Sequence, residues 1–274
     1  MHDEAARSLN TTFHRSIRAK VLDAIAQYAL IAPHDNIAVC ISGGKDSMLL
    51  AKVLQEVQAH GDVPFSLRFL SMDPGYSPQN RAKLEENAAK LHIPLEIFRT
   101  DVFRIADTHA KNPCFLCAKM RRGWLYTQAR ALGCNKIALG HHFDDVAETI
   151  LMAMVYGGQV QTMMPKLHAE HYPGMELIRP LYLVHERDVI AWAAHNGLSF
   201  LDCACEVSAR RGEGEGSKRA EIKALIARLG EGNPQIKQNI VNSVKNIDLT
   251  RVLGYHIGDT KSNFLDFYNE EESK

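Results

Sequence analysis

The stretch Cys40–Ser47, "CISGGKDS", overlaps the end of an apolar run, Asn36–Ile41, and comes directly before residues with helical apolar spacing. This order predicts a buried strand, a polar turn and an amphipathic helix. Glycines in such a turn let backbone N–H groups face an anion, and the N-terminus of the helix adds partial positive charge. Ser42 and Ser47 can donate hydrogen bonds, and Lys45 supplies a point charge. The stretch therefore predicts a phosphate-binding loop.

The residues around this loop predict an alternation of strands and helices from 36 to about 156. Further strands are expected over 65–72, 94–100 and 136–140. Such alternation is typical of an α/β fold with a parallel sheet and helices on both faces. Ligands of such sheets bind at the carboxyl ends of the strands. The segments 71–75, "SMDPG", and 140–145, "GHHFDD", also follow predicted strands, so three polar loops are expected at one edge of the sheet.

The composition is that of a soluble globular protein, with 46% hydrophobic and 23% charged residues among 274. A formal net charge of zero argues against broad coating of nucleic acid but allows a local basic patch. No apolar run reaches the roughly 18 residues of a membrane helix. The first residues also lack the pattern of a signal peptide. A cytoplasmic protein without membrane contact is expected.

Four regions are expected along the chain. An N-terminal helix should occupy 1–35, and a nucleotide-binding catalytic domain should occupy 36–205. A mobile loop and C-terminal helices are expected over 206–250, because the stretch 206–219 is rich in glycine and charge. The range 251–274 is expected to be a frayed tail, since its last residues are acidic.

The phosphate-binding loop is not a Walker A loop, because Asp46 follows the lysine and Val39 stands where the first glycine of that motif belongs. Instead, residues 42–47, "SGGKDS", resemble the PP-loop of the ATP pyrophosphatases, which cut ATP between its α and β phosphates. The segment 140–149, "GHHFDDVAET", resembles the GHxxDDxxET segment of the tRNA-thiolating branch. Residues 114–123, "CFLCAKMRRG", resemble the CxxC and Arg-Arg-Gly of that branch.

As a set, these motifs are most similar to the TtcA family of tRNA 2-thiocytidine synthetases, with TtuA-type tRNA thiolases further off. The resemblance covers roughly residues 15–250 and implies the PP-loop α/β fold with a helical C-terminal appendage. It implies an ATP-dependent tRNA sulfurtransferase that adenylates a pyrimidine O2 and replaces that oxygen with sulfur. It also implies ATP, Mg²⁺ and a [4Fe-4S] cluster as cofactors, and tRNA as a partner. The sulfur donor would be a cysteine desulfurase or a thiocarboxylated carrier, and a homodimer is expected.

The resemblance and the loop positions together predict the nucleotide contacts. They are Ser42, Gly43, Gly44, Lys45, Asp46, Ser47, Met72, Asp73, Gly140, His141 and Asp145. Catalytic roles are expected for Lys45, Asp46 and Asp145, and carboxylates at this edge suit Mg²⁺. Asp145 is preferred to Asp144, although acids at a helix start often only complement the helix dipole. Asp73 has an alternative role as a turn residue, and His141 is expected to hydrogen-bond the nucleotide or to shuttle a proton.

The six cysteines divide into two groups. Cys40 and Cys134 are expected to be structural thiols. The spacing of Cys114 and Cys117 suits either zinc or an iron–sulfur cluster, with Cys203 and Cys205 available to complete four ligands. The resemblance favours a three-cysteine cluster on the first pair and Cys203. Cys205 is the alternative third ligand or a sulfur relay, because the family usually spaces this second pair as CxxC.

The range Lys111–Lys136 holds six Lys or Arg residues and no acid. Within it, Arg121 and Arg122 are expected to contact phosphates of ATP or tRNA. Tyr76 and Trp124 are expected either to stack on a base or to pack in the core. Two other functions stay open: a PP-loop amidotransferase or lysidine-type ligase with a structural zinc on four cysteines, and a redox-sensing or tRNA-binding module without catalysis.

Overall fold

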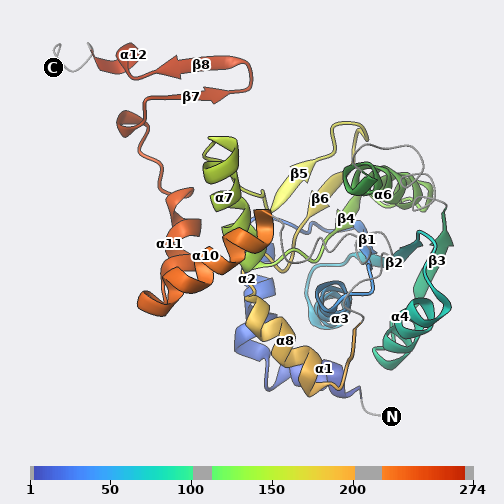
Figure 1. Ribbon diagram of the computed structural model, residues 1–274. Coiled ribbons are helices and arrows are strands. Elements are labelled where there is room, and N and C mark those ends of the chain that lie inside the picture. The colour runs from blue at the N-terminus through green and yellow to red at the C-terminus, as the bar shows by residue number, and fades with distance from the viewer. Residues whose placement is uncertain (1–2, 101–112, 201–217, 269–274) are drawn as a thin grey trace.

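The computed structural model describes residues 3–100, 113–200 and 218–268 (Figure 1). Its centre is a six-stranded sheet with the strand order β3-β2-β1-β4-β6-β5. The strands are Asn36–Cys40 (β1), Ser66–Asp73 (β2), Leu95–Arg99 (β3), Lys136–Ala138 (β4), Lys166–His168 (β5) and Glu176–Ile178 (β6). All neighbours pair in parallel except β5, which runs antiparallel to β6 at one edge. The predicted α/β fold is confirmed, with an antiparallel edge strand that the sequence did not predict.

Helices connect and cover these strands. They are Glu4–Asn10 (α1), Ala19–Gln27 (α2, after a π-helical turn over His14–Arg18), Lys45–His60 (α3), Pro78–Lys90 (α4), Pro113–Ala131 (α6), Phe143–Gly157 (α7), Glu186–His195 (α8), Lys218–Gly232 (α10), Ile236–Ser243 (α11) and Leu265–Tyr268 (α12). A 3-10 turn covers Leu249–Arg251, and Gly254–Ile257 (β7) pairs with Thr260–Asn263 (β8) in a separate hairpin. Among these helices, none is long and apolar enough to cross a membrane.

Alternate residues of β1 face opposite sides of the sheet, as strand geometry requires. Ile37 and Val39 belong to the larger core, which also holds buried residues of α1, α2, α3, α4, α7 and α8. Ala38 and Cys40 belong to the smaller core, which packs against Tyr126 of α6. Figure 1 shows α6 apart from α3 and α8, with the central strands between them. The layers therefore leave the carboxyl ends of β1 and β4 as neighbours at one edge.

At the opposite end of the sheet, a buried lysine connects the starts of three strands. Lys136 of β4 is 3% exposed, and its Nζ lies 2.7 Å from Asp35 Oδ2 and 3.1 Å from Glu176 Oε2. It also donates to the Leu30 carbonyl oxygen at 2.9 Å. Burial alone would raise the pKa of Asp35, but hydrogen bonds from Lys136, the Ala32 amide and Asn135 hold it below its usual value. One side chain thus connects the starts of β1, β4 and β6.

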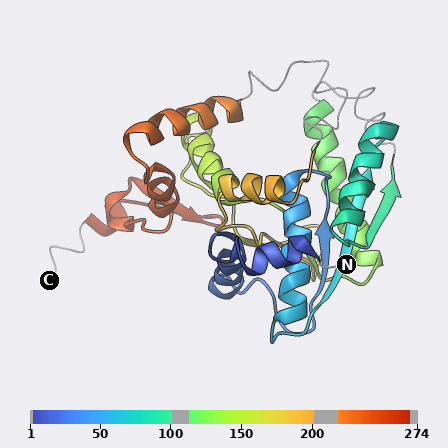
Figure 2. The ribbon, with the colours of Figure 1, turned by 90° about the horizontal axis from the view of Figure 1, so that it is seen from below.

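The C-terminal helices α10 and α11 are part of the main core. Ile222, Ile226, Ile240 and Val241 are buried in the same cluster as the sheet residues. The β7–β8 hairpin lies apart from the sheet in both ribbon views (Figures 1 and 2). Leu253, just before it, is 85% exposed, and Ile257 within it is 74% exposed. The four regions expected from the sequence stay a prediction, since the segment around 206 lies outside the described residues.

We predict that Lys136→Met lowers the free energy of unfolding by about 3–5 kcal/mol, because it leaves the buried Asp35 carboxylate without its lysine partner and Glu176 with Lys166 as its only lysine partner. Lys166→Met is the matched control. Its Nζ lies 3.2 Å from the same Glu176 carboxylate but its side chain is 31% exposed, so its loss should cost about 1 kcal/mol or less. Urea unfolding at pH 7 measures both values.

The pH dependence of this ion pair has a defined sign. The pKa values of Asp35 and Glu176 are lowered in the fold, in each case by hydrogen bonds from lysine that outweigh burial. Their contribution is therefore present above pH of about 4 and is lost as pH falls through the lower folded values. Equal costs for the two lysine substitutions, or no acid-dependent difference between wild type and Lys136→Met, would contradict the assignment.

Candidate active site

The phosphate-binding loop follows β1 and ends where α3 begins. Gly43 has φ of 88°, a left-handed conformation that favours glycine. Gly44 is the N-cap of α3 and no side chain caps this helix, so the amides of its first turn are available to an anion. The Ser47 hydroxyl accepts from the Ser42 amide at 3.2 Å and donates to the Gly44 carbonyl at 2.9 Å. Ser47 therefore holds the shape of the loop.

Gly140, after β4, lets a second loop approach this one. A Cβ at Gly140 would lie 3.0 Å from the carbonyl carbon and oxygen of Asp46 and 3.1 Å from the Ser47 amide nitrogen. These are backbone atoms at the start of α3, so a larger residue would push the two loops apart. Because β1 and β4 are adjacent while the chain leaves them toward different helices, this point is the switch point of the sheet, where α/β proteins bind ligands.

A cavity of about 440 Å³ lies at this point, within the range of ligand pockets. Nine of the expected site residues line it: Ser42, Asp46, Ser47, Met72, Arg121, Arg122, Gly140, His141 and Asp145. Cys40, Ile41, Leu125, Ile137 and Leu139 form its apolar lining. A polar, cationic side and an apolar side in one cavity suit a nucleotide, which has a phosphate end and a base.

Asp145 caps its own helix. Its Oδ2 accepts from the His142 amide at 3.1 Å, while His142 Nδ1 accepts from the Asp145 amide at 3.3 Å. Its Oδ1 accepts from Arg219 Nη1 of α10 at 2.9 Å, and the same nitrogen lies 3.0 Å from Glu148. Asp145 and His142 thus form a capping box, which the sequence analysis did not predict, and the other carboxylate oxygen of Asp145 pairs with a cation next to the cavity.

Asp144 is held by different partners and does not line the cavity. It accepts from the Glu186 amide at 2.7 Å and from Lys237 of α11, and His185 Nδ1 lies 3.8 Å away. Burial would raise the pKa of Asp144, but the hydrogen bonds from Lys237 and Glu186 lower it. Asp144 is thus a structural carboxylate that joins α7, α8 and α11.

Lys45 and Asp46 lie between the phosphate-binding loop and the C-terminal helices. Lys45 Nζ is 3.2 Å from the Asp46 carboxylate and 3.3 Å from Glu186 Oε1. Asp46 Oδ1 is buried and accepts no hydrogen bond from the described part of the chain. His142 Nε2 lies 3.6 Å from it, so the His142 ring stands between Asp46 and Asp145.

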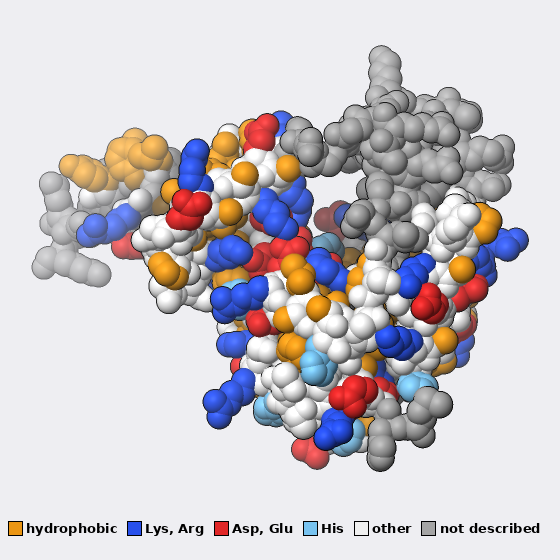
Figure 3. All heavy atoms as spheres, turned by 60° about the horizontal axis from the view of Figure 1, so that its bottom comes forward, with side chains coloured by type: hydrophobic (Ala, Val, Ile, Leu, Met, Phe, Trp, Pro, Cys, Tyr) orange, Lys and Arg blue, Asp and Glu red, His pale blue; other side chains and the backbone are white. Residues whose placement is uncertain are grey.

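These residues share a second cavity of about 320 Å³ with Glu148, Glu186, Arg219 and Lys223. Lys223 Nζ pairs with Glu186 Oε2 at 2.7 Å. On the face drawn in Figure 3, acidic side chains lie among lysines and arginines between the C-terminal helices and the body. The sequence alone indicates no site role for Lys223 or Glu186, because their partners are far away along the chain.

Of the remaining expected contacts, one lines the cavity and three contact other parts of the protein. Met72 lines the 440 Å³ cavity. Asp73 accepts from the Gly75 and Tyr76 amides at 3.0 and 2.8 Å and from Arg81 at 2.8 Å, which is the turn role that the sequence also allowed. Tyr76 donates to the Ser42 carbonyl at 3.3 Å, and Trp124 packs edge-on against Phe98 with ring centroids 5.5 Å apart.

The cysteines lie in three places. Cys40 and Cys134 are buried, and burial raises their pKa values to about 12 and about 11, so both are inert thiols at neutral pH. Cys114 and Cys117 lie near the start of α6, seven and four residues before Arg121, which lines the cavity. Cys203 and Cys205 lie outside the described residues. Among the described side chains, no cluster of metal-ligating residues is formed.

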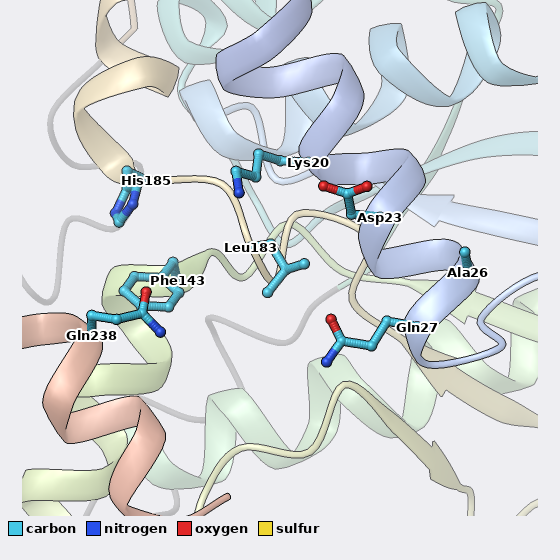
Figure 4. A pocket seen from close by; sticks show the side chains of 8 residues that line it. All are labelled: Lys20, Asp23, Ala26, Gln27, Phe143, Leu183, His185 and Gln238. Carbon is cyan, nitrogen blue, oxygen red and sulfur yellow. The ribbon is translucent and has the colours of Figure 1, made fainter.

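A third cavity lies behind the start of α7 and shares no residue with the other two. It measures about 470 Å³ and is lined by Lys20, Asp23, Ala26, Gln27, Phe143, Leu183, His185 and Gln238. Figure 4 shows Lys20, Gln27 and Gln238 extending toward it from α2 and α11. Its lining is polar and includes no residue that the sequence singled out.

Comparison with known proteins identifies the family of this chain. The PP-loop domain family matches residues 10–208. The tRNA-cytidine(32) 2-sulfurtransferase of Syntrophotalea carbinolica is 33% identical over 248 residues, which cover 89% of this chain and 94% of the relative. The enzyme of the same name from Legionella pneumophila is 32% identical, covering 91% of this chain and 84% of the relative.

The fold also matches a solved structure. The U34-tRNA thiolase NcsA from Methanococcus maripaludis, with its [4Fe-4S] cluster, superimposes with a TM-score of 0.68 over 86% of this chain and 80% of NcsA, at 22% sequence identity. At that identity the match concerns the fold alone. The matching family model and these relatives lead to one conclusion: this chain belongs to the PP-loop family and, within it, to the tRNA-cytidine(32) 2-sulfurtransferases.

Proposed function

We propose that this protein adenylates O2 of a cytidine in tRNA with ATP and then replaces that oxygen with sulfur, giving 2-thiocytidine. Membership of the sulfurtransferase family supports tRNA thiolation as the reaction class. The target base must leave its stack to reach the cavity, as single-stranded bases in RNA loops can.

The observation that carries the proposal is the course of α6. It begins with Cys114 and Cys117, and Arg121 and Arg122, which line the nucleotide-sized cavity, follow about one turn after Cys117. A helix rises 1.5 Å per residue, so Cys117 and Cys114 lie about 6 Å and about 10 Å along the helix axis from Arg121. One helix thus carries both the CxxC pair and two arginines of the cavity, a combination that a plain ATP-dependent ligase does not need.

The first step uses the phosphate-binding loop. The O2 lone pair attacks the α-phosphorus of ATP, and the bond from that phosphorus to the bridging oxygen breaks with release of pyrophosphate. The first-turn amides of α3 and the Lys45 ammonium stabilise the charge that develops on the leaving pyrophosphate. The buried Asp46 Oδ1, which accepts no hydrogen bond from the described part of the chain, and the Asp145 carboxylate are suitable Mg²⁺ ligands, and the metal would neutralise phosphate charge when bound.

The second step exchanges oxygen for sulfur. A hydrosulfide equivalent attacks C2 of the adenylated base, the C2–O bond breaks, and AMP leaves with the oxygen. Adenylation is needed because an amide-like oxygen is a poor leaving group. Cys114 and Cys117 lie three residues apart on one helix and therefore share a face, which fits two thiolates of a [4Fe-4S] cluster. Such a cluster would present sulfur at an iron without a protein ligand.

Cys203 is proposed as the third cluster ligand, with Cys205 as the alternative ligand or a sulfur relay. The sulfur donor is proposed to be a separate protein, either a cysteine desulfurase or a thiocarboxylated carrier. A homodimer is proposed as the assembly.

We predict that Lys45→Ala lowers AMP and pyrophosphate release in the presence of unmodified tRNA by about 100-fold, because the leaving pyrophosphate loses its cation. The measurement is single-turnover formation of AMP from labelled ATP. Lys245→Ala, a lysine without a role in the described site, should retain wild-type rates. Undiminished AMP formation in Lys45→Ala would contradict adenylation at this loop.

We predict that anaerobically purified protein is brown and holds about four irons per chain. Cys114→Ala and Cys117→Ala should each lose most of the iron and all 2-thiocytidine formation, whereas Cys134→Ala, a buried thiol, should keep both. Iron and sulfide analysis, visible spectra and nucleoside analysis of tRNA report the outcome. The same assays on Cys203→Ala and Cys205→Ala identify the third ligand.

A colourless protein with one zinc per chain would make the four cysteines a structural site. Adenylation would then stand, and an amine rather than sulfur would be the expected nucleophile.

A further inference from the structure

A buried arginine contacts one of the residues that line the cavity. Arg179 directly follows β6 and is 8% exposed. Its Nε donates to His141 Nδ1 at 3.2 Å, and its Nη1 donates to the Met164 carbonyl oxygen. Its backbone amide donates to the Pro165 carbonyl at 3.0 Å. The guanidinium is thus held from two sides with one edge toward His141.

No carboxylate within the described residues forms an ion pair with Arg179. Lys136, the comparable buried cation of this fold, has two such partners. A buried charge without a counter-charge is costly, and burial lowers the pKa of Arg179 to about 10. That value still leaves the guanidinium protonated at neutral pH. A cation placed here at such a cost indicates a role beyond packing.

The contact determines which nitrogen of His141 carries hydrogen. Arginine has only donors, so the nitrogen that faces Arg179, Nδ1, must offer its lone pair. A neutral imidazole has one N–H group, which must then be at Nε2. Burial, followed by the charge of Arg179, lowers the pKa of His141 to about 4, while Asp145 acts in the opposite direction and Arg219 and His142 add smaller lowering effects. His141 is therefore neutral at physiological pH.

His141 lines the 440 Å³ cavity and Arg179 does not, so Nε2 is the nitrogen that a bound molecule can reach. We propose that Arg179 is a positioning residue that fixes His141 as the Nε2–H tautomer, so that His141 donates a hydrogen bond to an oxygen of the bound nucleotide. The role in catalysis rests on the proposed function, while the tautomer itself does not.

This assignment decides between the two roles that the sequence allowed for His141. As a proton shuttle, the ring would have to accept a proton at the nitrogen that faces the cavity, which already carries one. As a fixed neutral donor, it stabilises negative charge on a phosphoryl oxygen as adenylation proceeds. It does so without adding a second full positive charge beside Arg179.

The first test measures the tautomer in the full-length wild-type protein. Long-range ¹H–¹⁵N correlation spectra of protein labelled in its histidine rings distinguish the two neutral tautomers and the imidazolium. The chain has thirteen histidines, and the His141 signals are identified by their absence in His141→Gln. We expect a protonated Nε2 and an unprotonated Nδ1 at pH 7. An Nδ1–H tautomer or an imidazolium would overturn the proposal, whatever the activity of the protein.

The second test removes the arginine. In Arg179→Met, the fixed tautomer should be lost, and the titration midpoint of His141 should rise part of the way from about 4, because burial, the larger cause of its lowered pKa, remains. Arg179→Lys should retain part of the effect, because it keeps a cationic donor. Arg228→Met, an exposed arginine of α10, is the matched control and should leave the His141 spectrum unchanged. A purely structural role for Arg179 would lower the unfolding midpoint without moving these signals.

The third test separates a donor from a base. The side-chain amide of His141→Gln can still donate but cannot act as a base near neutral pH, whereas His141→Phe can do neither. We expect single-turnover AMP formation to fall about 100-fold in His141→Phe and at most about 10-fold in His141→Gln, with a similar KM for ATP. Equal and complete loss in both variants would overturn the donor role. Inactive wild-type protein with the expected tautomer would instead contradict the proposed function alone.

Discussion

The site depends on the close approach of two loops at Gly140. The phosphate-binding loop owes its conformation to the left-handed Gly43 and to the hydrogen bonds of the Ser47 hydroxyl. The loop after β4 approaches the backbone of the phosphate-binding loop only because Gly140 has no side chain. The order of the strands makes this approach possible, since β1 and β4 are neighbours and their chains leave toward different helices. Backbone amides from one loop and carboxylates from the other can then face the same molecule.

Opposite charges join the C-terminal helices to this centre. Arg219 and Lys223 of α10 pair with acids of α7 and α8, and Lys237 of α11 pairs with Asp144. Each acid at the site therefore has a cation before a nucleotide arrives. A second cation at this Asp145 oxygen would compete with Arg219 for it. The C-terminal helices thus contribute to the electrostatics of the site as well as to the core.

Much of the fold and part of the site could be predicted from local patterns. A few adjacent residues predict the strand before Ser42, the glycine turn and the start of α3. The neighbours Pro74 and Gly75 likewise predict the turn role of Asp73. The strand β5 has three residues and a short antiparallel partner, which is too little for a periodic pattern. Contacts such as that of Arg179 with His141 join segments that only the folded sheet brings together, so no spacing rule could find them.

The helix α6 also fixes the distance and the relative rotation between two sequence motifs. The cysteine pair and the paired arginines lie on one continuous helix, so the number of residues between them determines both the distance and the rotation that separate them. Each residue adds about 100° of rotation as well as 1.5 Å of rise. One residue gained or lost between Cys117 and Arg121 would therefore rotate the two motifs relative to each other by about 100° while moving them only about 1.5 Å along the axis. The spacing of these two motifs is thus under a rotational constraint, which a flexible linker of the same length would not impose.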